Sequence, residues 1–405
     1  MCAGVDGVLG ELLEAGHLCD FDSLPMLVAR HAAAVGLGDL RIYLVDRQQA
    51  VLRVLPRVPD EVLGEPELKI DDSLPGLAFR DIEVVGPYRT PEEEAAGEPY
   101  WLWVPMLDGT ERVGVMELRM PQARRDLIER ARALASLVTL MIISKRVHSD
   151  TFARITRTRR MSLAAEVQWQ LMPPLAFANK EVVVGAALEP AYEVGGDAFS
   201  YALSGRSFYL SIFDAMGHDT SAGLTASIAI GSWRSHRRMG LGLAAISEAI
   251  ARDVIEQFDG ERYVTGILSH LDLDTGELTW VNRGHPPPLI IGGGRWIDTL
   301  ESEPALPMGL LLPERPREYR RRLEPGDRLL YYTDGIPEAR DPSGELFGME
   351  RFAGFVVRQE AKGLSAPETL RQLMRDILLY QNGRLQDDAA VLLAEWRAGT
   401  AARVF

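Results

Sequence analysis

The first 122 residues alternate between helical and extended patterns of apolar residues. In LPMLVARHAAAVG (residues 24–36) the apolar positions recur every three or four residues, which predicts a helix. The next two apolar runs, LRIYLVD and AVLRVLP, alternate with period two around the turn residues RQQ, which predicts a strand pair. A short helix at DSLPGLAF and a second strand pair, YWLWVPML and ERVGVMEL, follow. The pattern predicts one α/β domain over residues 1–122.

Residues 123–171 contain no Gly or Pro and carry apolar residues at irregular helical spacing, which predicts one long helix. The helix is expected to end at Met172, because Pro173 and Pro174 cannot continue it. A helix of this length between two domains typically pairs with a second copy or transmits movement. The basic run Arg154–Arg160 is interpreted as a solvated face of this helix, because no aromatic residues are interleaved with it.

Composition limits the range of partners and locations. The formal net charge of -14 disfavours binding to nucleic acid and to anionic membrane surfaces. The two cysteines, Cys2 and Cys19, both lie near the start and cannot build a disulfide framework. The longest apolar run, LASLVTLMII, is shorter than the roughly 20 residues that a membrane span requires. We expect a cytoplasmic protein that binds neither nucleic acid nor a membrane.

The remaining residues form a third region in which strands enclose helices predicted at residues 221–238, 242–258 and 366–379. In this region Asp214 and Asp334 each end an apolar strand, whereas Asp387 and Asp388 begin one. Carboxylates at strand ends have rigid backbones and can converge above the edge of a sheet. Because no matching His or Cys set accompanies them, they predict a site for hard, oxygen-coordinated ions such as Mg²⁺ or Mn²⁺.

The sequence EVGGDAFS (residues 193–200) is close to the GGDEF signature of enzymes that make cyclic dinucleotides, but Ala198 stands where that signature has Glu. The region from about residue 160 to 396 instead resembles the SpoIIE-type serine phosphatases, a bacterial branch of the metal-dependent type 2C (PPM) protein phosphatases. Seven blocks carry the resemblance in the right order: LAAEVQWQLMPP, EVGGDAF, FDAMGHDTSAG, NRGHPPPLI, LPMGLL, LEPGDRLLYYTDGIPEARD and LQDDAAVLL. The order of elements in residues 21–147 resembles a GAF sensory domain.

These resemblances imply an α+β protein in four parts. They are a GAF-like α/β sensor domain (residues 1–122), a long linker helix (123–172), a PPM-type α-β-β-α sandwich phosphatase domain (173–397) and a C-terminal tail (398–405). The implied activity is removal of phosphate from serine or threonine of a regulatory protein, under control of the sensor. The implied substrate is a phosphorylated anti-anti-sigma (STAS) protein. We also expect a homodimer formed through the helix and a small-molecule ligand of the GAF-like domain.

The resemblance also implies the roles of individual residues. Asp214 would bridge two Mn²⁺ or Mg²⁺ ions, with the carbonyl of Ala215 on one of them, and two or three ions would be bound in all. Asp334 and Asp387 would complete the second site, Asp197 would hold an ion or its water, and Asp388 would support Asp387. Many relatives have a further Asp at the position of Ser200, so its absence predicts weaker binding of the second ion. The alternative function is a phosphatase-fold scaffold that has lost catalysis.

Two histidines within these blocks are further candidates. His218, four residues after Asp214, is a candidate proton donor to the leaving oxygen or, equally, a solvent-facing imidazole. His285, which precedes three prolines, is interpreted as a residue with a structural hydrogen bond. Neither histidine is expected to bind a metal ion.

Overall fold

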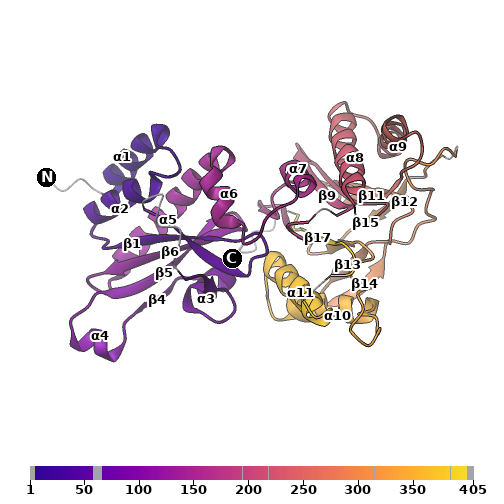
Figure 1. Cartoon of the computed structure of the whole chain (residues 1–405). Helices are drawn as coiled ribbons and strands as arrows, with labels where there is room; N and C mark the ends of the chain where they lie inside the picture. The colour runs from indigo at the N-terminus through magenta and orange to yellow at the C-terminus, as the bar shows by residue number, and fades with distance from the viewer. Residues whose placement is uncertain are drawn as a thin grey trace. The chain divides into compact units, whose positions relative to one another are not determined.

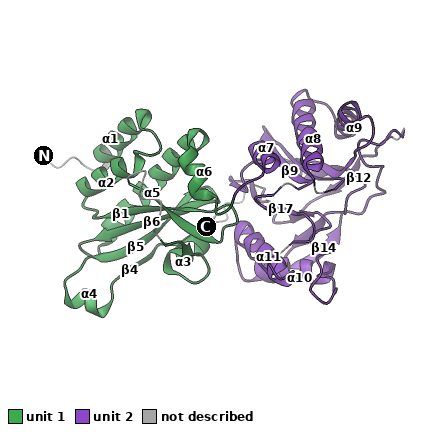
Figure 2. Cartoon of the chain, viewed as in Figure 1, with its two compact units in different colours: residues 1–159, 405 green, residues 160–404 purple. Residues whose placement is uncertain are grey.

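The computed structural model describes residues 5–57, 66–193, 195–217, 219–312, 315–383 and 385–398. The chain divides into two compact units (Figures 1 and 2). Unit 1 consists of residues 1–159 together with 405, and unit 2 consists of residues 160–404. Most of the expected C-terminal tail lies outside the described residues. None of the helices within the described ranges is both long enough and apolar enough to cross a membrane.

Unit 1 is built on a six-stranded sheet in the order β3-β2-β1-β6-β5-β4. Every neighbouring pair in it is antiparallel, including the two predicted pairs, β1 with β2 and β5 with β6. The strands are β1 (Leu40–Val45), β2 (Val51–Leu55), β3 (Leu68–Lys69), β4 (Val85–Tyr88), β5 (Tyr100–Asp108) and β6 (Glu111–Met120). This sheet is compatible with a GAF-like fold, and the GAF resemblance stays a prediction.

Helices cover both faces of this sheet (Figure 1). Leu40, Ile42 and Leu44 of β1 point into a core shared with one group of helices, whereas Tyr43 lies in a second core on the other face with Phe79. The first group comprises α1 (Val5–Leu18), α2 (Leu24–Ala34), α5 (Arg125–Lys145) and α6 (Asp150–Thr156), and the second face is covered by α3 (Leu74–Asp81). The alternation of strand side chains therefore fills a core on each side.

The prediction of one long helix over residues 123–171 is wrong, because the segment forms several shorter helices. Helix α5 runs into a 3-10 turn (Arg146–His148), Ser149 caps α6, and α7 (Leu163–Leu171) begins only after an extended connection. The guanidinium of Arg53 on β2 donates to the carbonyls of Arg154, Ile155 and Arg157 at distances of 2.8–3.1 Å. This distant side chain satisfies carbonyls that end α6, so the helix stops there.

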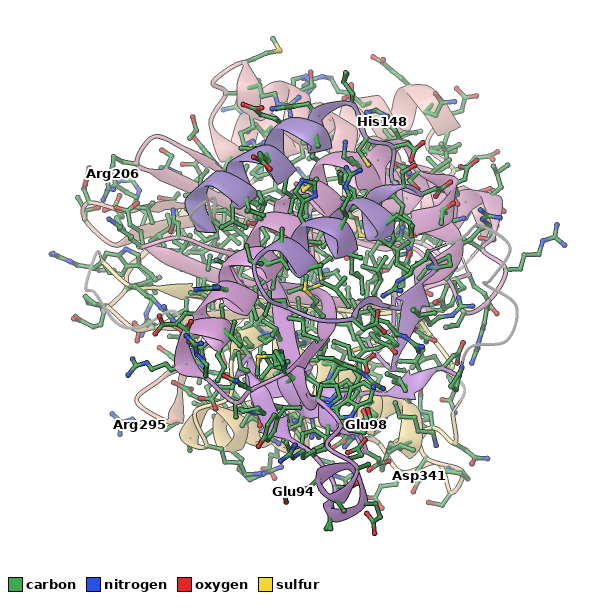
Figure 3. The ribbon with its side chains drawn as sticks, turned by 90° about the vertical axis from the view of Figure 1, so that its left-hand side faces the viewer. Glu94, Glu98, His148, Arg206, Arg295 and Asp341 are labelled. Atoms are coloured by element: carbon green, nitrogen blue, oxygen red, sulfur yellow. The ribbon has the colours of Figure 1, made fainter. Side chains whose placement is uncertain are left out.

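The polar stretch RTPEEEAAGEP contains a short helix, α4 (Pro91–Ala95). Thr90 and Glu93 make a reciprocal capping box, with Thr90 Oγ1 accepting from the Glu93 amide and the Glu93 carboxylate accepting from the Thr90 amide. Glu94 on α4 and Glu98 just after it are exposed (Figure 3). The capping sequence explains a helix in an otherwise polar stretch.

Unit 2 contains two antiparallel sheets, in the orders β15-β12-β11-β10-β9 and β14-β13-β16-β17-β8-β7. The strands of the first sheet are β9 (Asp197–Ser204), β10 (Ser207–Ala215), β11 (Val264–Asp272), β12 (Glu277–Arg283) and β15 (Tyr319–Arg322). Those of the second are β7 (Ala176–Ala178), β8 (Val182–Glu189), β13 (Leu289–Gly292), β14 (Arg295–Thr299), β16 (Arg328–Tyr332) and β17 (Ala389–Trp396). The helices are α7, α8 (Thr220–Arg238), α9 (Leu243–Phe258), α10 (Met349–Ala361) and α11 (Ala366–Tyr380).

Strand β17 shows how the layers of unit 2 are packed. Ala390, Leu392 and Trp396 point into the core between the two sheets, whereas Val391 and Leu393 point toward α10 and α11. Both faces of the strand are buried, which is why its sequence is almost continuously apolar. Helices α8 and α9 cover the outer face of the first sheet (Figure 1). The predicted α-β-β-α sandwich is confirmed.

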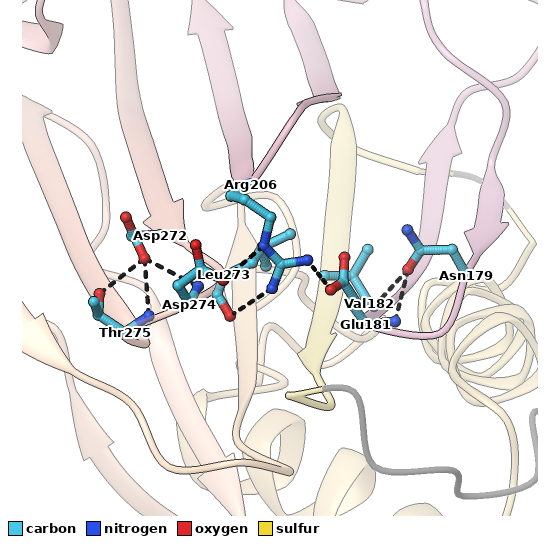
Figure 4. Close-up of polar contacts among 8 residues, drawn as sticks. All are labelled: Asn179, Glu181, Val182, Arg206, Asp272, Leu273, Asp274 and Thr275. Carbon is cyan, nitrogen blue, oxygen red and sulfur yellow. Dashed lines mark hydrogen bonds and ion pairs between the residues drawn. The ribbon is translucent and has the colours of Figure 1, made fainter.

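Arg206 joins turns from both sheets at one end of the sandwich (Figure 4). Its guanidinium donates to Glu181, which precedes β8, and to Asp274, which follows β11, with 2.8 Å between Arg206 Nε and Asp274 Oδ1. It also donates to the carbonyl of Leu273. We call Arg206, Glu181 and Asp274 the Arg206 cluster. It pairs opposite charges across the sheet ends.

Candidate active site

Strand pairing brings two of the predicted ligands together at the opposite end of the sandwich. Asp197 begins β9 and Asp214 lies next to the end of β10, and the two residues are direct antiparallel partners. Side chains of such partners lie on the same face of the sheet, with Cβ atoms about 4.5–5.5 Å apart. Asp197 is buried and Asp214 is partly buried. The carbonyl of Ala215 follows at the end of the same strand.

The second sheet supplies the other predicted carboxylates. Asp334 follows β16, Asp387 and Asp388 precede β17, and these two strands pair antiparallel with Tyr332 opposite Val391. Asp334 and Asp387 therefore lie at the same end of this sheet. Two hydrogen bonds join this end to the first sheet: Thr333 Oγ1 donates to Asp197 Oδ2 at 2.6 Å, and the Gly196 amide donates to Asp388 Oδ2 at 2.5 Å. We call Asp197, Asp214, Asp334, Asp387 and Asp388 the carboxylate cluster.

Glycine is required where the backbones of this site approach one another. A Cβ atom at Gly335 would lie 1.7 Å from the carbonyl oxygen of Asp388. A Cβ atom at Gly195 would lie 2.5 Å from the carboxyl carbon of the same residue. Neither position has room for a side chain, because the contacts are with backbone and with a buried carboxylate. The glycines of GGD and TDG thus allow the two strand ends to meet.

The carboxylates raise one another's pKa. Burial, followed by repulsion from Asp334, Asp387 and Asp388, raises the pKa of Asp214 to about 7. Burial and then the charge of Asp214 raise the pKa of Asp197 well above its usual range. The pKa of Asp334 is raised by burial and by Asp387. Anionic groups held together in this way are stabilised by a nearby positive charge.

The donor set of the carboxylate cluster fits a hard divalent cation. It consists of carboxylate oxygens and a strand-end carbonyl, which are the ligands that Mg²⁺ and Mn²⁺ prefer. Within the described ranges no three His, Cys, Asp or Glu side chains are already arranged as a coordination site. The chemistry of the residues therefore matches such an ion, and the ligand assignments stay predictions.

The structure places Ser200 away from the carboxylate cluster. Ser200 is buried on the opposite face of β9 from Asp197, three residues away, and the Arg234 Nε of α8 lies 3.4 Å from its hydroxyl. A side chain at this position faces α8 and not the carboxylate cluster, and the expected weaker binding of the second ion stays a prediction. His218 lies outside the described residues.

His285 has the structural hydrogen bonds that its sequence context suggested. Its ring is buried and lies between Thr265 Oγ1, 2.9 Å from Nδ1, and the carbonyl of Tyr332, 3.1 Å from Nε2. Nε2 therefore carries the proton and donates to the carbonyl. Burial lowers the pKa of His285 to about 4, so the ring is neutral at physiological pH.

Two contacts of Asp197 were not predicted. Besides the hydroxyl of Thr333, the buried side-chain amide of Gln168 on α7 donates to the carbonyls of Gly195 and Asp197. Thr333 directly precedes the predicted ligand Asp334, which was the one available signal in the sequence. Gln168 lies on a helix distant in sequence, and no local pattern indicated that it reaches this turn.

Comparison with known proteins assigns the family. Residues 204–397 match the sequence model of the family described as "Stage II sporulation protein E (SpoIIE)", and this range contains Asp214, Asp334 and Asp387. Unit 2 is a SpoIIE-type phosphatase domain. The match lies wholly within unit 2, and the predicted family and enzyme class, a serine/threonine protein phosphatase of the PP2C type, are confirmed.

Curated proteins similar to this chain include two phosphoserine phosphatases of Bacillus subtilis. RsbU is 23% identical over 235 residues, which cover 58% of this chain and 69% of RsbU. RsbP is 23% identical over 205 residues, which cover 48% of each chain. Among solved structures, the PP2C domain of SiaA from Pseudomonas aeruginosa superposes with a TM-score of 0.48 at 20% identity, covering 57% of this chain and 94% of that domain. The chain thus spans about half of RsbP and about two thirds of RsbU.

Proposed function

We propose that this chain hydrolyses phosphoserine or phosphothreonine of a regulatory protein with two divalent ions, Mn²⁺ or Mg²⁺. The ligands are the carboxylates of Asp197, Asp214, Asp334 and Asp387 and the carbonyl of Ala215. The observation that carries the proposal is the cross-strand pairing of Asp197 with Asp214 on one face, where burial and then the charges of Asp334 and Asp387 raise the pKa of Asp214. Such convergence of buried carboxylates is unfavourable without a cation, so it supports a binding site.

The position of each residue determines its proposed role in ion binding. Asp214 lies beside Asp197 on the neighbouring strand, and Asp334 and Asp387 of the other sheet interact with it electrostatically. Asp214 would therefore be the carboxylate shared between the two ions. Rigid strand ends keep these oxygens in place. When bound, the ions supply positive charge that activates the attacking water and balances charge on the phosphoryl oxygens. No side chain of the protein needs to form a covalent intermediate.

Calorimetric titration with Mn²⁺, combined with hydrolysis of p-nitrophenyl phosphate, tests this proposal. Wild-type protein should bind two ions and turn over, whereas Asp214→Ala should lose both properties. Asp253→Ala, at a partly buried position of α9, removes a carboxylate outside the cluster and serves as the matched control. A wild type that binds no ion and hydrolyses no more than Asp214→Ala would instead identify the domain as a catalytically empty scaffold.

The substrate is proposed to be a phosphorylated STAS protein of a partner-switching pathway. The support is the resemblance of the seven sequence blocks and the description of RsbU and RsbP as phosphoserine phosphatases. Phosphate release from a panel of phosphorylated proteins incubated with the enzyme tests this assignment. Release of phosphate from STAS proteins alone supports the assignment, and indifference to all of them contradicts it.

Control by unit 1 is proposed to reach the carboxylate cluster through α7. Besides Gln168, the indole of Trp169 donates to the carbonyl of Ala191 at 2.8 Å, and the Ser162 amide donates to the carbonyl of Tyr192 at 2.9 Å. A shift of α7 would therefore move the segment that leads to Asp197. A ligand of the GAF-like domain that binds two states of this helix unequally would change the population of complete sites.

A homodimer through residues 123–171 is part of the same proposal. Several apolar residues of this segment, such as Leu127, Leu134 and Ile155, are buried in the core of unit 1. The apolar side chains left exposed along the segment are Leu140, Val147, Leu163 and Val167. Light scattering on the full chain and on residues 160–405 tests the idea. A monomeric full chain, or unchanged activity in the fragment, would contradict it.

A further inference from the structure

The turn formed by Gly195, Gly196 and Asp197 is held from three directions by buried groups. Gln168 donates to the carbonyls of Gly195 and Asp197, Thr333 donates to the Asp197 carboxylate, and the Asp388 carboxylate accepts the Gly196 amide proton. Gln168, Thr333 and Asp388 have exposed fractions of 2%, 0% and 8%. The orientation of Asp197 is therefore set by residues outside β9 itself.

The hydroxyl of Thr333 has a defined direction. It accepts the Ala390 amide proton at 2.9 Å, so one of its lone pairs is used. Its single proton has two acceptors within reach, Asp197 Oδ2 at 2.6 Å and the Ala390 carbonyl at 3.4 Å, and the nearer carboxylate is the stronger acceptor. This bond occupies Oδ2 of Asp197 and leaves Oδ1 for another partner.

Asp388 uses its carboxylate in a different way from the neighbouring Asp387. Oδ2 of Asp388 accepts from the Gly196 amide, and the carboxyl group fills the space beside Gly195. The Asp387 carboxylate instead accepts from the Asp388 amide at 2.9 Å. Asp388 thus points toward the turn that precedes Asp197, which explains why two consecutive acidic residues precede β17.

We propose that Thr333 and Asp388 are positioning residues that fix the Gly195–Asp197 turn and direct Oδ1 of Asp197 toward the bound ions, without binding an ion themselves. The proposal rests on the two-ion function argued above. Residues that hydrogen-bond a metal ligand typically contribute about 10–100-fold to metal affinity. Thr333 acts on the carboxylate directly, whereas Asp388 acts through the backbone of Gly196.

The test compares Mn²⁺ affinity, measured by calorimetry, in paired conservative variants of the full chain. Thr333→Val keeps the shape but removes the hydroxyl and should weaken Mn²⁺ binding at least about 10-fold, whereas Thr333→Ser should stay within about 3-fold of wild type. Asp388→Asn keeps an oxygen that can accept the Gly196 amide proton and should bind Mn²⁺ nearly as wild type. Asp388→Ala should resemble Thr333→Val, and Asp387→Asn should lose binding because it removes a proposed ligand.

Thermal unfolding in EDTA accompanies each titration, so that loss of the fold is not read as loss of positioning. If Thr333→Val is unfolded, the contrast between Asp388→Asn and Asp388→Ala decides. Equal affinity of Thr333→Val and wild type would overturn the role of Thr333. A loss in Asp388→Asn as large as in Asp387→Asn would make Asp388 a ligand and overturn its positioning role. If wild type binds no Mn²⁺, the two-ion function fails, and the positioning proposal fails with it.

Discussion

The two ends of the phosphatase sandwich handle acidic residues in opposite ways. In the Arg206 cluster each carboxylate is paired with the same guanidinium, and these contacts raise the pKa of Arg206 (Figure 4). In the carboxylate cluster, burial and neighbouring acids raise the pKa of Asp197, Asp214 and Asp334. The Arg206 cluster pairs opposite charges, whereas the acidic side chains of the carboxylate cluster repel one another. A bound cation would relieve this repulsion.

The largest expected effect is on catalysis at the carboxylate end. Asp214→Ala should lower kcat/KM for p-nitrophenyl phosphate by about 10³-fold or more, because the charge stabilisation supplied by metal ions amounts to several kcal/mol. Arg206→Ala should retain near wild-type activity, since it lies at the other end. Comparable losses in the two variants would show that the ends are not functionally distinct.

The next effect concerns the contribution of the buried, neutral His285 to the stability of the fold. His285 has a pKa of about 4 in the folded protein and an ordinary value near 6.5 when unfolded, so the unfolded state binds more protons between these pH values. Its contribution to stability is present above pH 6.5 and is lost as the pH falls toward 4. The full loss amounts to roughly 3 kcal/mol.

Urea unfolding at pH 7.5 and pH 4.5 measures this contribution as a difference between wild type and His285→Gln. The variant should lose less stability on acidification than wild type does. His148→Gln is the control, because His148 is exposed (Figure 3) and should leave the pH dependence unchanged. Parallel pH curves for wild type and His285→Gln would exclude His285 as the source.

A smaller effect is expected from removing one charge of the carboxylate cluster. Asp214→Asn should raise the melting temperature of the metal-free protein at pH 8, because it removes a carboxylate that is repelled by Asp334 and Asp387. The same variant should gain less from added Mn²⁺ than wild type. Melting curves in EDTA and in Mn²⁺, with Asp253→Asn as control, check both statements. A lower melting temperature in EDTA would contradict the account of repulsion.

The smallest effect is expected at the Arg206 end. Its side chains are partly exposed, at 48% for Arg206 and 63% for Asp274, so solvent and salt screen the pairing. Arg206→Ala should lower the melting temperature slightly, and the difference from wild type should shrink in 1 M NaCl. Arg295→Ala, at an exposed position of β14 (Figure 3), is the comparison variant. A decrease in melting temperature that does not change with salt would contradict this account and indicate that the aliphatic part of the Arg206 side chain stabilises the fold by packing.

Much of unit 2 was predictable because its signals are local. The strand that ends next to Asp214 and the strand that follows Asp387 and Asp388 are indicated by apolar runs. The helices over residues 221–238, 242–258 and 366–379 follow from apolar spacing. Helix α10 was missed, although its 13 residues carry a helical pattern. The predicted ligands stay predictions, yet their placement at one end of two sheets agrees with the structure.

By itself the sequence determined two strand pairs of unit 1, three helices of unit 2, the family blocks and the strand-end carboxylates, because each depends on a few neighbouring residues. Tertiary structure decided where residues 123–171 stop being helical, since Arg53 reaches the end of α6 from a distant strand. It also decided that Ser200 faces α8 and that Thr333 and Asp388 hold the turn before β9. These outcomes depend on which backbones approach one another after the sheets have packed, and local spacing carries no information about that.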